Sequence, residues 1–260
     1  MTAKKQVQEL KIVDYKEINS EFFIIELKSS IILPEILPGQ FAEVLVNNSP
    51  NTFLRRPLSI HDVDYKKNTI KFLIQIVGDG TRELAKSKVN ETLNVIFPLG
   101  NSFSIPKTSN VLLVGGGCGI APLLLLAKMA SLKGIKPKIL IGGRNKEYLL
   151  DIEEYHKYGD VYITTEDGSV GEKGFVIHHS ILWDEKMKFE KIYTCGPEPM
   201  MQAIAKYAKK RNMECEVSLE NLMACGFGVC LCCVVDTIRG NVCTCTEGPV
   251  FNINELKWQI

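Results

Sequence analysis

Hydrophobic and polar residues alternate over short runs in the first 105 positions of the chain. The runs are rich in β-branched and aromatic side chains and occupy residues 21–27, 40–46 and 69–77. Turn-forming Pro, Gly and Asn residues separate them. Short strands divided by turns in this way are typical of an antiparallel barrel or sandwich. We therefore predict a β-rich first region, with one brief helix at residues 81–86.

The pattern changes at about residue 106. An apolar run at residues 111–114 reads as a buried strand, and glycines and a helical stretch to residue 133 follow it. Further strand-like runs lie at residues 138–141, 161–164 and 191–194, with helical patterns near 148–157 and 199–211. Alternating strands and helices predict a parallel sheet with helices on its faces.

The last part of the chain is short and rich in cysteines and turns. A segment of this size has little room for a hydrophobic core and needs a metal centre to hold it. The overall expectation is an α+β multidomain protein. It would have an antiparallel β-barrel at residues 1–105, an α/β parallel-sheet domain at 106–212 and a small domain at 213–260.

Composition narrows the function classes. The 260 residues carry 31 Lys and Arg against 30 Asp and Glu, a net charge of +1, so the basic footprint of a nucleic-acid-binding protein is missing. The first ten residues lack the apolar core of a signal peptide, and the apolar run at 120–127 is too short to span a bilayer. We expect a cytoplasmic protein with no membrane contact.

Cysteine usage points to a metal centre. There are nine cysteines, an odd number, and six lie between Cys225 and Cys245. A secreted disulfide scaffold would spread an even number along a short chain. Four of them give the spacing C-x4-C-x2-C-x11-C, namely Cys225, Cys230, Cys233 and Cys245. The first three match the plant-type spacing of a [2Fe–2S] cluster.

Glycines between these cysteines support the cluster. Gly226 and Gly228 allow a loop to turn backbone N–H groups toward sulfur. The alternatives are zinc, whose sites usually pair two C-x2-C-like knuckles, and reduced core cysteines. The spacing leaves the ligand choice open, because Cys232 adjoins Cys233 and Cys243 lies two residues before Cys245.

A glycine-rich turn connects the strand at 111–114 to the helix after it, with glycines at Gly115, Gly116, Gly117 and Gly119. A helix N-terminus offers unpaired N–H groups to phosphate, and glycines let the phosphate approach the backbone. The turn is not a G-x-G-x-x-G fingerprint, because Ile120 takes the place of the last glycine. It is a nucleotide site or simply a tight turn.

A second strand, turn and helix follow at Cys195 and Gly196. Cys195 is placed either to lie over a nicotinamide or to pack in the core. Arg144, at the end of another strand, is a ribose or phosphate contact or, slightly favoured, a surface charge.

The first region holds a candidate flavin cradle in the consecutive residues Arg56, Pro57, Leu58 and Ser59. Arg56 can neutralise a diphosphate, and Ser59 can form a hydrogen bond with the reactive edge of a flavin ring. Gly80 and Thr81, at the start of the brief helix, offer a second phosphate cradle. Taken alone, such a strand can also be purely structural.

Taken together, these motifs resemble the ferredoxin-reductase superfamily. The opening of the cysteine segment at 223–230 and its close at 248–251 resemble most closely the electron-transfer subunits of dihydroorotate dehydrogenase B. The resemblance covers essentially the whole chain and implies a six-stranded FAD barrel, an NAD-binding domain and a [2Fe–2S] domain. Leu58 departs from the aromatic residue that many ferredoxin reductases have there.

The resemblance also implies the site residues. The FAD contacts fall on Arg56, Pro57, Leu58, Ser59, Leu73, Ile74, Gln75, Gly80 and Thr81. The nicotinamide nucleotide falls on Gly115, Gly116, Gly117, Gly119, Cys195 and Gly196. The cluster ligands fall on Cys225, Cys230, Cys233 and Cys245.

In that family an FMN-containing partner subunit oxidises dihydroorotate, and electrons pass through the [2Fe–2S] cluster and FAD to NAD in pyrimidine biosynthesis. The implied assembly is a heterotetramer of two plus two subunits, and no catalytic residue for dihydroorotate is expected in this chain. Two alternatives are the flavin subunit of an NAD(P)H–ferredoxin oxidoreductase or sulfhydrogenase, and a zinc-stabilised interaction module. Some of these reductases have an acid at the position of Cys225.

Overall fold

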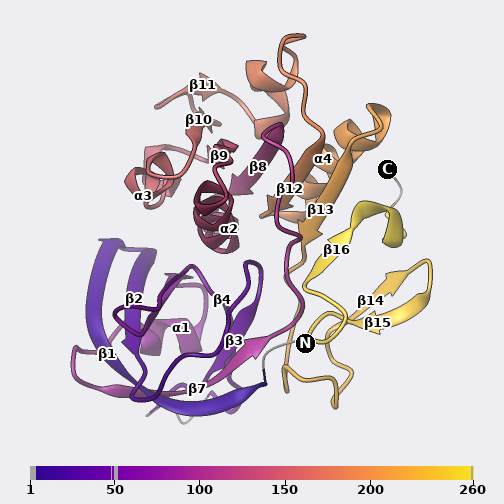
Figure 1. The fold of residues 1–260 in the computed structure, drawn as a ribbon. Helices are drawn as coiled ribbons and strands as arrows, with labels where there is room; N and C mark the ends of the chain where they lie inside the picture. Colours follow the sequence, from indigo (N-terminus) through magenta and orange to yellow (C-terminus); the bar gives the residue numbers. More distant parts are fainter. Residues whose placement is uncertain (1–3, 48, 50–51, 259) are drawn as a thin grey trace.

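The computed structural model describes residues 4–47, 49, 52–258 and 260. Figure 1 shows an antiparallel sheet formed by the N-terminal part of the chain, an α/β layer beside it, and a small C-terminal hairpin at one side. Among the described residues, no helix is long and apolar enough to cross a membrane.

The N-terminal sheet has seven antiparallel strands in the order β4-β3-β7-β1-β2-β6-β5. Its strands are β1 (Gln6–Asn19), β2 (Phe22–Lys28), β3 (Phe41–Val44), β4 (Arg56–Ser59), β5 (Asp62–Asp64), β6 (Thr69–Gln75) and β7 (Thr92–Leu99). Strand β4 also lies against β6, which curves the sheet into a half-barrel. The count is one more than the implied six, because it includes the three-residue β5. Helix α1 (Asp79–Leu84) follows β6 and confirms the predicted brief helix.

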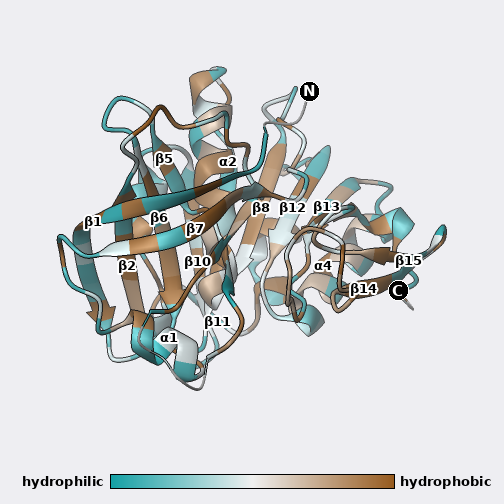
Figure 2. Cartoon of the chain, turned by 90° about the horizontal axis from the view of Figure 1, so that it is seen from below, coloured by the Kyte–Doolittle hydropathy of each residue, from teal (hydrophilic) through white to brown (hydrophobic). Residues whose placement is uncertain are grey.

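Alternation along the strands builds the core of this half-barrel. In β1, Leu10 and Ile12 are fully buried, whereas Glu9 and Lys11, on either side of Leu10, are exposed. The mixed teal and brown colouring of β1 is consistent with this pattern (Figure 2). One face of β1 therefore supplies apolar side chains to the inside of the curve. Strand β2 is buried on both faces, with Phe23 and Ile25 in this core and Phe22 and Ile24 in the cluster that contains α2.

The second sheet has the order β11-β10-β9-β8-β12-β13-β16 and is parallel except for β16. Its strands are β8 (Val111–Gly116), β9 (Lys138–Gly143), β10 (Asp160–Thr165), β11 (Glu172–Lys173), β12 (Lys191–Cys195), β13 (Glu214–Ser218) and β16 (Val250–Asn252). Its helices are α2 (Ala121–Leu132), α3 (Ile152–His156) and α4 (Glu198–Lys210).

Strand β8 is buried on both faces. Leu113 packs in one apolar cluster with α2, while Leu112 and Val114 pack in another with α4. Helices therefore cover both sides of the sheet, as a parallel sheet requires. The predicted α/β region is confirmed.

The C-terminal segment contains the hairpin of β14 (Val234–Thr237) and β15 (Gly240–Cys243). It is inserted between β13 and β16, which pair with each other at the edge of the parallel sheet. The sheet thus continues beyond residue 212 on both sides of the cysteine segment. The domain boundaries given above stay predictions.

Candidate electron-transfer site

The cysteine loop directs backbone N–H groups at sulfur. The four sulfur atoms of the implied ligand set each accept one, and these contacts are Cys230 N to Cys225 Sγ at 3.5 Å, Cys232 N to Cys230 Sγ at 3.5 Å, Cys245 N to Cys233 Sγ at 3.4 Å and Gly228 N to Cys245 Sγ at 3.1 Å. Such bonds offset the negative charge of thiolates and are a recognised means of tuning an iron–sulfur centre. The loop therefore fits a cluster held by these four cysteines.

Positive backbone angles make this loop shape possible. Gly226 has φ of 75° and Gly228 has φ of 90°, a region in which side chains with a Cβ are disfavoured. Burial by itself would raise the pKa of Cys225, but backbone N–H groups, first that of Phe227, lower it to about 6. A thiol that ionises this readily is suited to bind metal.

All nine cysteines are free thiols. Among the described residues, no group of three or more His, Cys, Asp or Glu side chains meets closely enough to hold a single metal ion.

The cysteine loop packs on the outside of the half-barrel. Cys233 and Cys245 share a buried apolar cluster with Phe41 of β3 and Leu99 of β7. Glu43, also on β3, has no exposed surface, and neither carboxylate oxygen has a hydrogen-bond partner among the described residues. A Cβ at Gly226 would lie 2.6 Å from Glu43 Cγ, so the loop and this side chain are in close contact.

The candidate flavin residues lie on β4, next to β3. In the register of these strands, Pro57 is opposite Glu43 and Ser59 is opposite Phe41. Arg56 packs against the start of α1, because a Cβ at Gly80 would lie 2.8 Å from Arg56 Cδ. This close approach joins the two predicted phosphate-binding segments at one place.

Thr81 stabilises the turn before α1. Its hydroxyl oxygen accepts hydrogen bonds from the N–H groups of Val77 at 2.9 Å and Gly78 at 3.2 Å. Leu73, Ile74 and Gln75 form the end of β6, immediately before this turn. The predicted FAD residues on β4, β6 and α1 are therefore neighbours, since β4 lies against β6.

The glycine-rich turn and the Cys195–Gly196 turn touch each other. A Cβ at Gly119 would lie 2.3 Å from Gly196 Cα, and a Cβ at Gly116 would lie 2.6 Å from Met200 Sδ. Gly115 is equally confined, since its Cβ would lie 2.5 Å from Ile120 Cγ2. Gly117 has open space but a φ of 53°. Contact with backbone explains Gly119, contact with side chains explains Gly115 and Gly116, and the positive φ explains Gly117.

A cavity of about 740 Å³ opens in front of these turns. Its walls include Gly116, Gly117, Gly119, Gly196 and, from the half-barrel, Gln75. Its size suits a cofactor fragment, and its position at the carboxyl ends of parallel strands is the usual place for a nucleotide. The nucleotide cavity therefore meets the flavin residues at the end of β6.

Cys195 and Arg144 differ in their access to this cavity. Arg144 lines it, whereas Cys195 is 1% exposed and is not part of its wall. Burial raises the pKa of the Cys195 thiol well above its ordinary value. The Cys195 side chain is therefore buried behind the turn and does not line the cavity in which the nicotinamide was predicted to lie.

Glu220 also lines the cavity and was not predicted. It lies two residues after the end of β13, beside the end of β12. Burial among the surrounding protein atoms raises the pKa of its carboxyl group, although the side chain is accessible through the cavity. The strand-end rule that identified the other residues would have found Glu220, had β13 been predicted.

Comparisons with known proteins agree with this geometry. Residues 220–257 match the iron–sulfur cluster binding domain of dihydroorotate dehydrogenase B, and residues 113–206 match the oxidoreductase NAD-binding domain. Two similar proteins carry the name dihydroorotate dehydrogenase B (NAD(+)), electron transfer subunit. The one from Fusobacterium nucleatum is 33% identical over 97% of this chain and 99% of its own length. The one from Caldanaerobacter subterraneus is 39% identical over 84% and 86%.

Solved structures show the same architecture. A structure of NADH-dependent reduced ferredoxin-NADP oxidoreductase, described for flavin-based electron bifurcation, is 31% identical, with a TM-score of 0.86 over 96% of this chain and 90% of that chain. The ferredoxin reductase of carbazole 1,9a-dioxygenase, at 21% identity and a TM-score of 0.71 over 82% and 68%, shares the fold.

Half-barrel, nucleotide sheet and cysteine loop together define an NAD-linked flavin and iron–sulfur oxidoreductase subunit with the ferredoxin-reductase fold. Its cofactors are FAD, a [2Fe–2S] cluster and NAD. Identity over nearly the whole length of both chains then gives the particular family. The chain belongs to the electron transfer subunits of dihydroorotate dehydrogenase B (NAD(+)).

Proposed function

We propose that this chain passes electrons from dihydroorotate oxidation in an FMN-containing partner subunit to NAD⁺, in the cytoplasm, as a step of pyrimidine biosynthesis. The observation that carries the proposal is the order of the three sites. The cysteine loop packs on β3, the flavin residues lie on the adjacent β4 and on β6, and Gln75 at the end of β6 opens into the nucleotide cavity. FAD supplies the chemistry that this order needs, since it exchanges both single electrons and hydride.

The chain's own residues would bind and orient these groups. Arg56 and the turn at Gly80–Thr81 would hold the diphosphate of FAD, and Ser59 would bond to the reactive edge of its ring. The N–H groups at 228, 230, 232 and 245 would stabilise a cluster on Cys225, Cys230, Cys233 and Cys245. Gly115, Gly116, Gly117, Gly119 and Gly196 would let the nucleotide approach the backbone.

An exposed apolar surface supports contact with a partner subunit. Around the cysteine loop, Leu222 is 81% exposed, Val229 74% and Leu231 64%. Apolar side chains that gather at one exposed site mark protein–protein contacts. We propose that the dihydroorotate-oxidising subunit covers this surface, in an assembly of two copies of each subunit.

Anaerobic co-purification tests the proposal. The chain would be expressed with the FMN subunit, and dihydroorotate-dependent NAD⁺ reduction would be measured with and without it. We expect NADH only when both chains are present, and a mass consistent with two plus two subunits. A stable complex with a different large subunit, or equal NAD⁺ reduction without this chain, would reject it.

The similarity to the NADH-dependent ferredoxin-NADP oxidoreductase structure favours a second candidate, a ferredoxin-linked reductase subunit. Reduction of NAD(P)⁺ by ferredoxin but not by dihydroorotate would support that candidate. Zinc instead of iron in a colourless preparation would reject both.

A further inference from the structure

His61 connects the flavin strand to the nucleotide turn. It lies two residues after Ser59, at the end of β4, and has no exposed surface. Its Nδ1 is 2.9 Å from the carbonyl oxygen of Ala121, the first residue of α2. Ala121 in turn lies two residues after Gly119. Two short stretches of backbone therefore link the predicted flavin-edge contact to the predicted phosphate-binding glycines.

The other ring nitrogen of His61, Nε2, also contacts a residue of the α/β part. Nε2 is 3.3 Å from Asp151 Oδ2, and Lys16 of β1 approaches the other oxygen of that carboxylate at 3.6 Å. Burial alone would raise the pKa of Asp151, but the hydrogen bond and charge of His61, with the charge of Lys16, lower it. The carboxylate is thus held in its ionised, accepting form and fixes the orientation of the imidazole.

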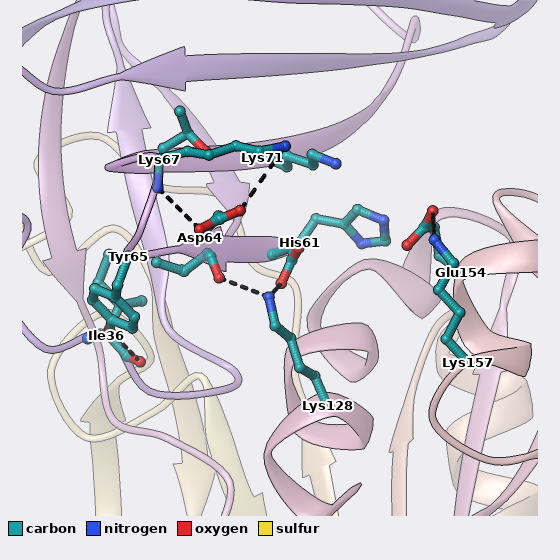
Figure 3. Close-up of polar contacts among 12 residues, drawn as sticks. Ile36, His61, Asp64, Tyr65, Lys67, Lys71, Lys128, Glu154 and Lys157 are labelled. Atoms are coloured by element: carbon teal, nitrogen blue, oxygen red, sulfur yellow. Dashed lines mark hydrogen bonds and ion pairs between the residues drawn. The ribbon is translucent and has the colours of Figure 1, made fainter. Parts of the chain in front are cut away.

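A reciprocal ion pair lies beside this contact. Lys128 of α2 donates hydrogen bonds to Asp62 Oδ1 at 2.7 Å and to the Val63 carbonyl at 2.8 Å. Figure 3 shows Lys128 reaching from α2 toward β5, and the ring of His61 pointing toward the segment that carries Glu154. The half-barrel and the α/β part therefore each supply a lysine to an acid of the other, Lys16 to Asp151 and Lys128 to Asp62.

Tyr155 packs beside the His61 ring and is itself held by a hydrogen bond. The Tyr155 ring lies 6.3 Å from that of His61, and its hydroxyl donates to the Ile120 carbonyl at 2.6 Å. The Lys128 contacts to Asp62 and Val63 are partly buried, and other polar contacts between the half-barrel and the α/β part, such as Tyr148 Oη to Glu21 Oε2, are exposed. His61 is thus a fully buried hydrogen-bonding side chain at this junction, so its loss is not compensated by water.

We propose that His61 is a positioning residue for hydride exchange, holding the start of α2 at a fixed place relative to β4 and thereby the nicotinamide relative to the flavin ring. The inference rests on the proposed function. Hydride exchange depends steeply on the separation of the reacting atoms, and a displacement of about 1 Å can cost roughly a hundredfold in rate. His61 itself touches neither reacting group.

Two variants separate the two hydrogen bonds of the ring. The amide nitrogen of Asn takes the place of Nδ1, so H61N keeps the bond to Ala121. The amide nitrogen of Gln takes the place of Nε2, so H61Q keeps the bond to Asp151 and loses the bond to α2. H156Q, at an exposed histidine of α3, is the matched control.

The measurement is anaerobic flavin reduction by NADH in the FAD-loaded, cluster-loaded chain. We expect the limiting rate to fall roughly ten- to hundredfold in H61Q, with a much smaller change in the NADH dissociation constant, and to stay near wild type in H61N and H156Q. A wild-type rate in H61Q, or equal losses in H61N and H61Q, would overturn the proposal.

Hydrogen exchange gives a readout that needs no nicotinamide. The amides of residues 117–128 should exchange faster in H61Q than in H61N. Unchanged exchange in H61Q would contradict the proposal, whereas failure of wild-type flavin to accept hydride would contradict the proposed function instead. If H61Q does not fold, H61A carries the test, because it also removes the bond to Ala121 and introduces no new polar group. Flavin reduction should slow in H61A relative to H61N, and a wild-type rate there would overturn the proposal.

Discussion

At the scale of residues, close contacts between two glycine-containing turns shape the nucleotide cavity. The contact of Gly119 with Gly196 leaves no room for a methyl group, and the sequence could predict the importance of this glycine from its place between strand and helix. Glu220 was missed because strand β13 was not predicted, and the sequence could not predict the contacts of Glu43 or His61. These contacts depend on which side chains meet after the three parts pack together, and no local pattern encodes that.

Substitution of Gly119 by Ala should close the nucleotide site selectively. The added Cβ would lie 2.3 Å from Gly196 Cα, so the two turns must separate. We expect the NADH dissociation constant to rise at least tenfold, a loss of about 1.4 kcal/mol in binding free energy, at unchanged FAD and iron content. Fluorescence titration checks this, with G134N as control, because Gly134 has open space around it and Asn tolerates its positive φ. Equal NADH affinity in G119A and wild type would contradict the site.

Glu43 should make stability depend on pH. Burial, opposed by the charges of Arg56 and Arg55, raises the pKa of Glu43 from its ordinary value of 4.5 to about 7. The unfolded chain therefore releases this proton at lower pH than the folded one. The contribution of Glu43 to stability is fully present below pH 4.5 and is lost as the pH rises to about 7.

The expected loss is roughly 3 kcal/mol over this range. The variant E43Q does not titrate and should escape it, so its advantage over wild type should grow from pH 5 to pH 7. Thermal unfolding of the loaded protein at several pH values measures the difference. A difference between E43Q and wild type that is independent of pH would show that Glu43 is not buried as a titrating acid.

At the scale of elements, the sequence predicts strands and helices with strong apolar patterns, but it does not predict which strands pair at the edge of a sheet. Strand β8 and helix α2 follow from an apolar run, glycines and a helical pattern, and both are where the sequence predicts them. Strand β1 has Gln8 on its buried face and exposed Val7, which obscures its alternation. Strand β16 joins β13 across the whole cysteine segment, a long-range pairing that only the folded chain reveals.

The cysteine segment should also act as the docking element. Replacement of Leu222, 81% exposed, by Asp places a charge on the apolar surface around the loop. We expect the affinity for the FMN subunit to fall by about 2 kcal/mol, roughly thirtyfold, with unchanged iron, sulfide and FAD. Calorimetry or gel filtration measures this. I32D, at an exposed isoleucine of the half-barrel, should bind like wild type, and equal binding by L222D would place the interface elsewhere.

At the scale of the whole molecule, three parts that each bind one redox group are packed in a fixed order. The resemblance predicted this order, because the motifs follow one another along the chain as in the family. The contacts that fix it, Phe41 with the cysteine loop and Gln75 with the nucleotide cavity, come only from the structure. Their consequence is that electrons can pass between the cluster and NAD within one polypeptide.

Anaerobic titration of the purified chain with NADH, followed by visible absorption and EPR spectroscopy, tests this claim most directly. The account predicts a coloured protein whose flavin absorption bleaches, and one [2Fe–2S] EPR signal per chain as the cluster takes an electron. A protein that holds no FAD, or no iron and acid-labile sulfide, or whose flavin is reduced without any cluster signal, would contradict it.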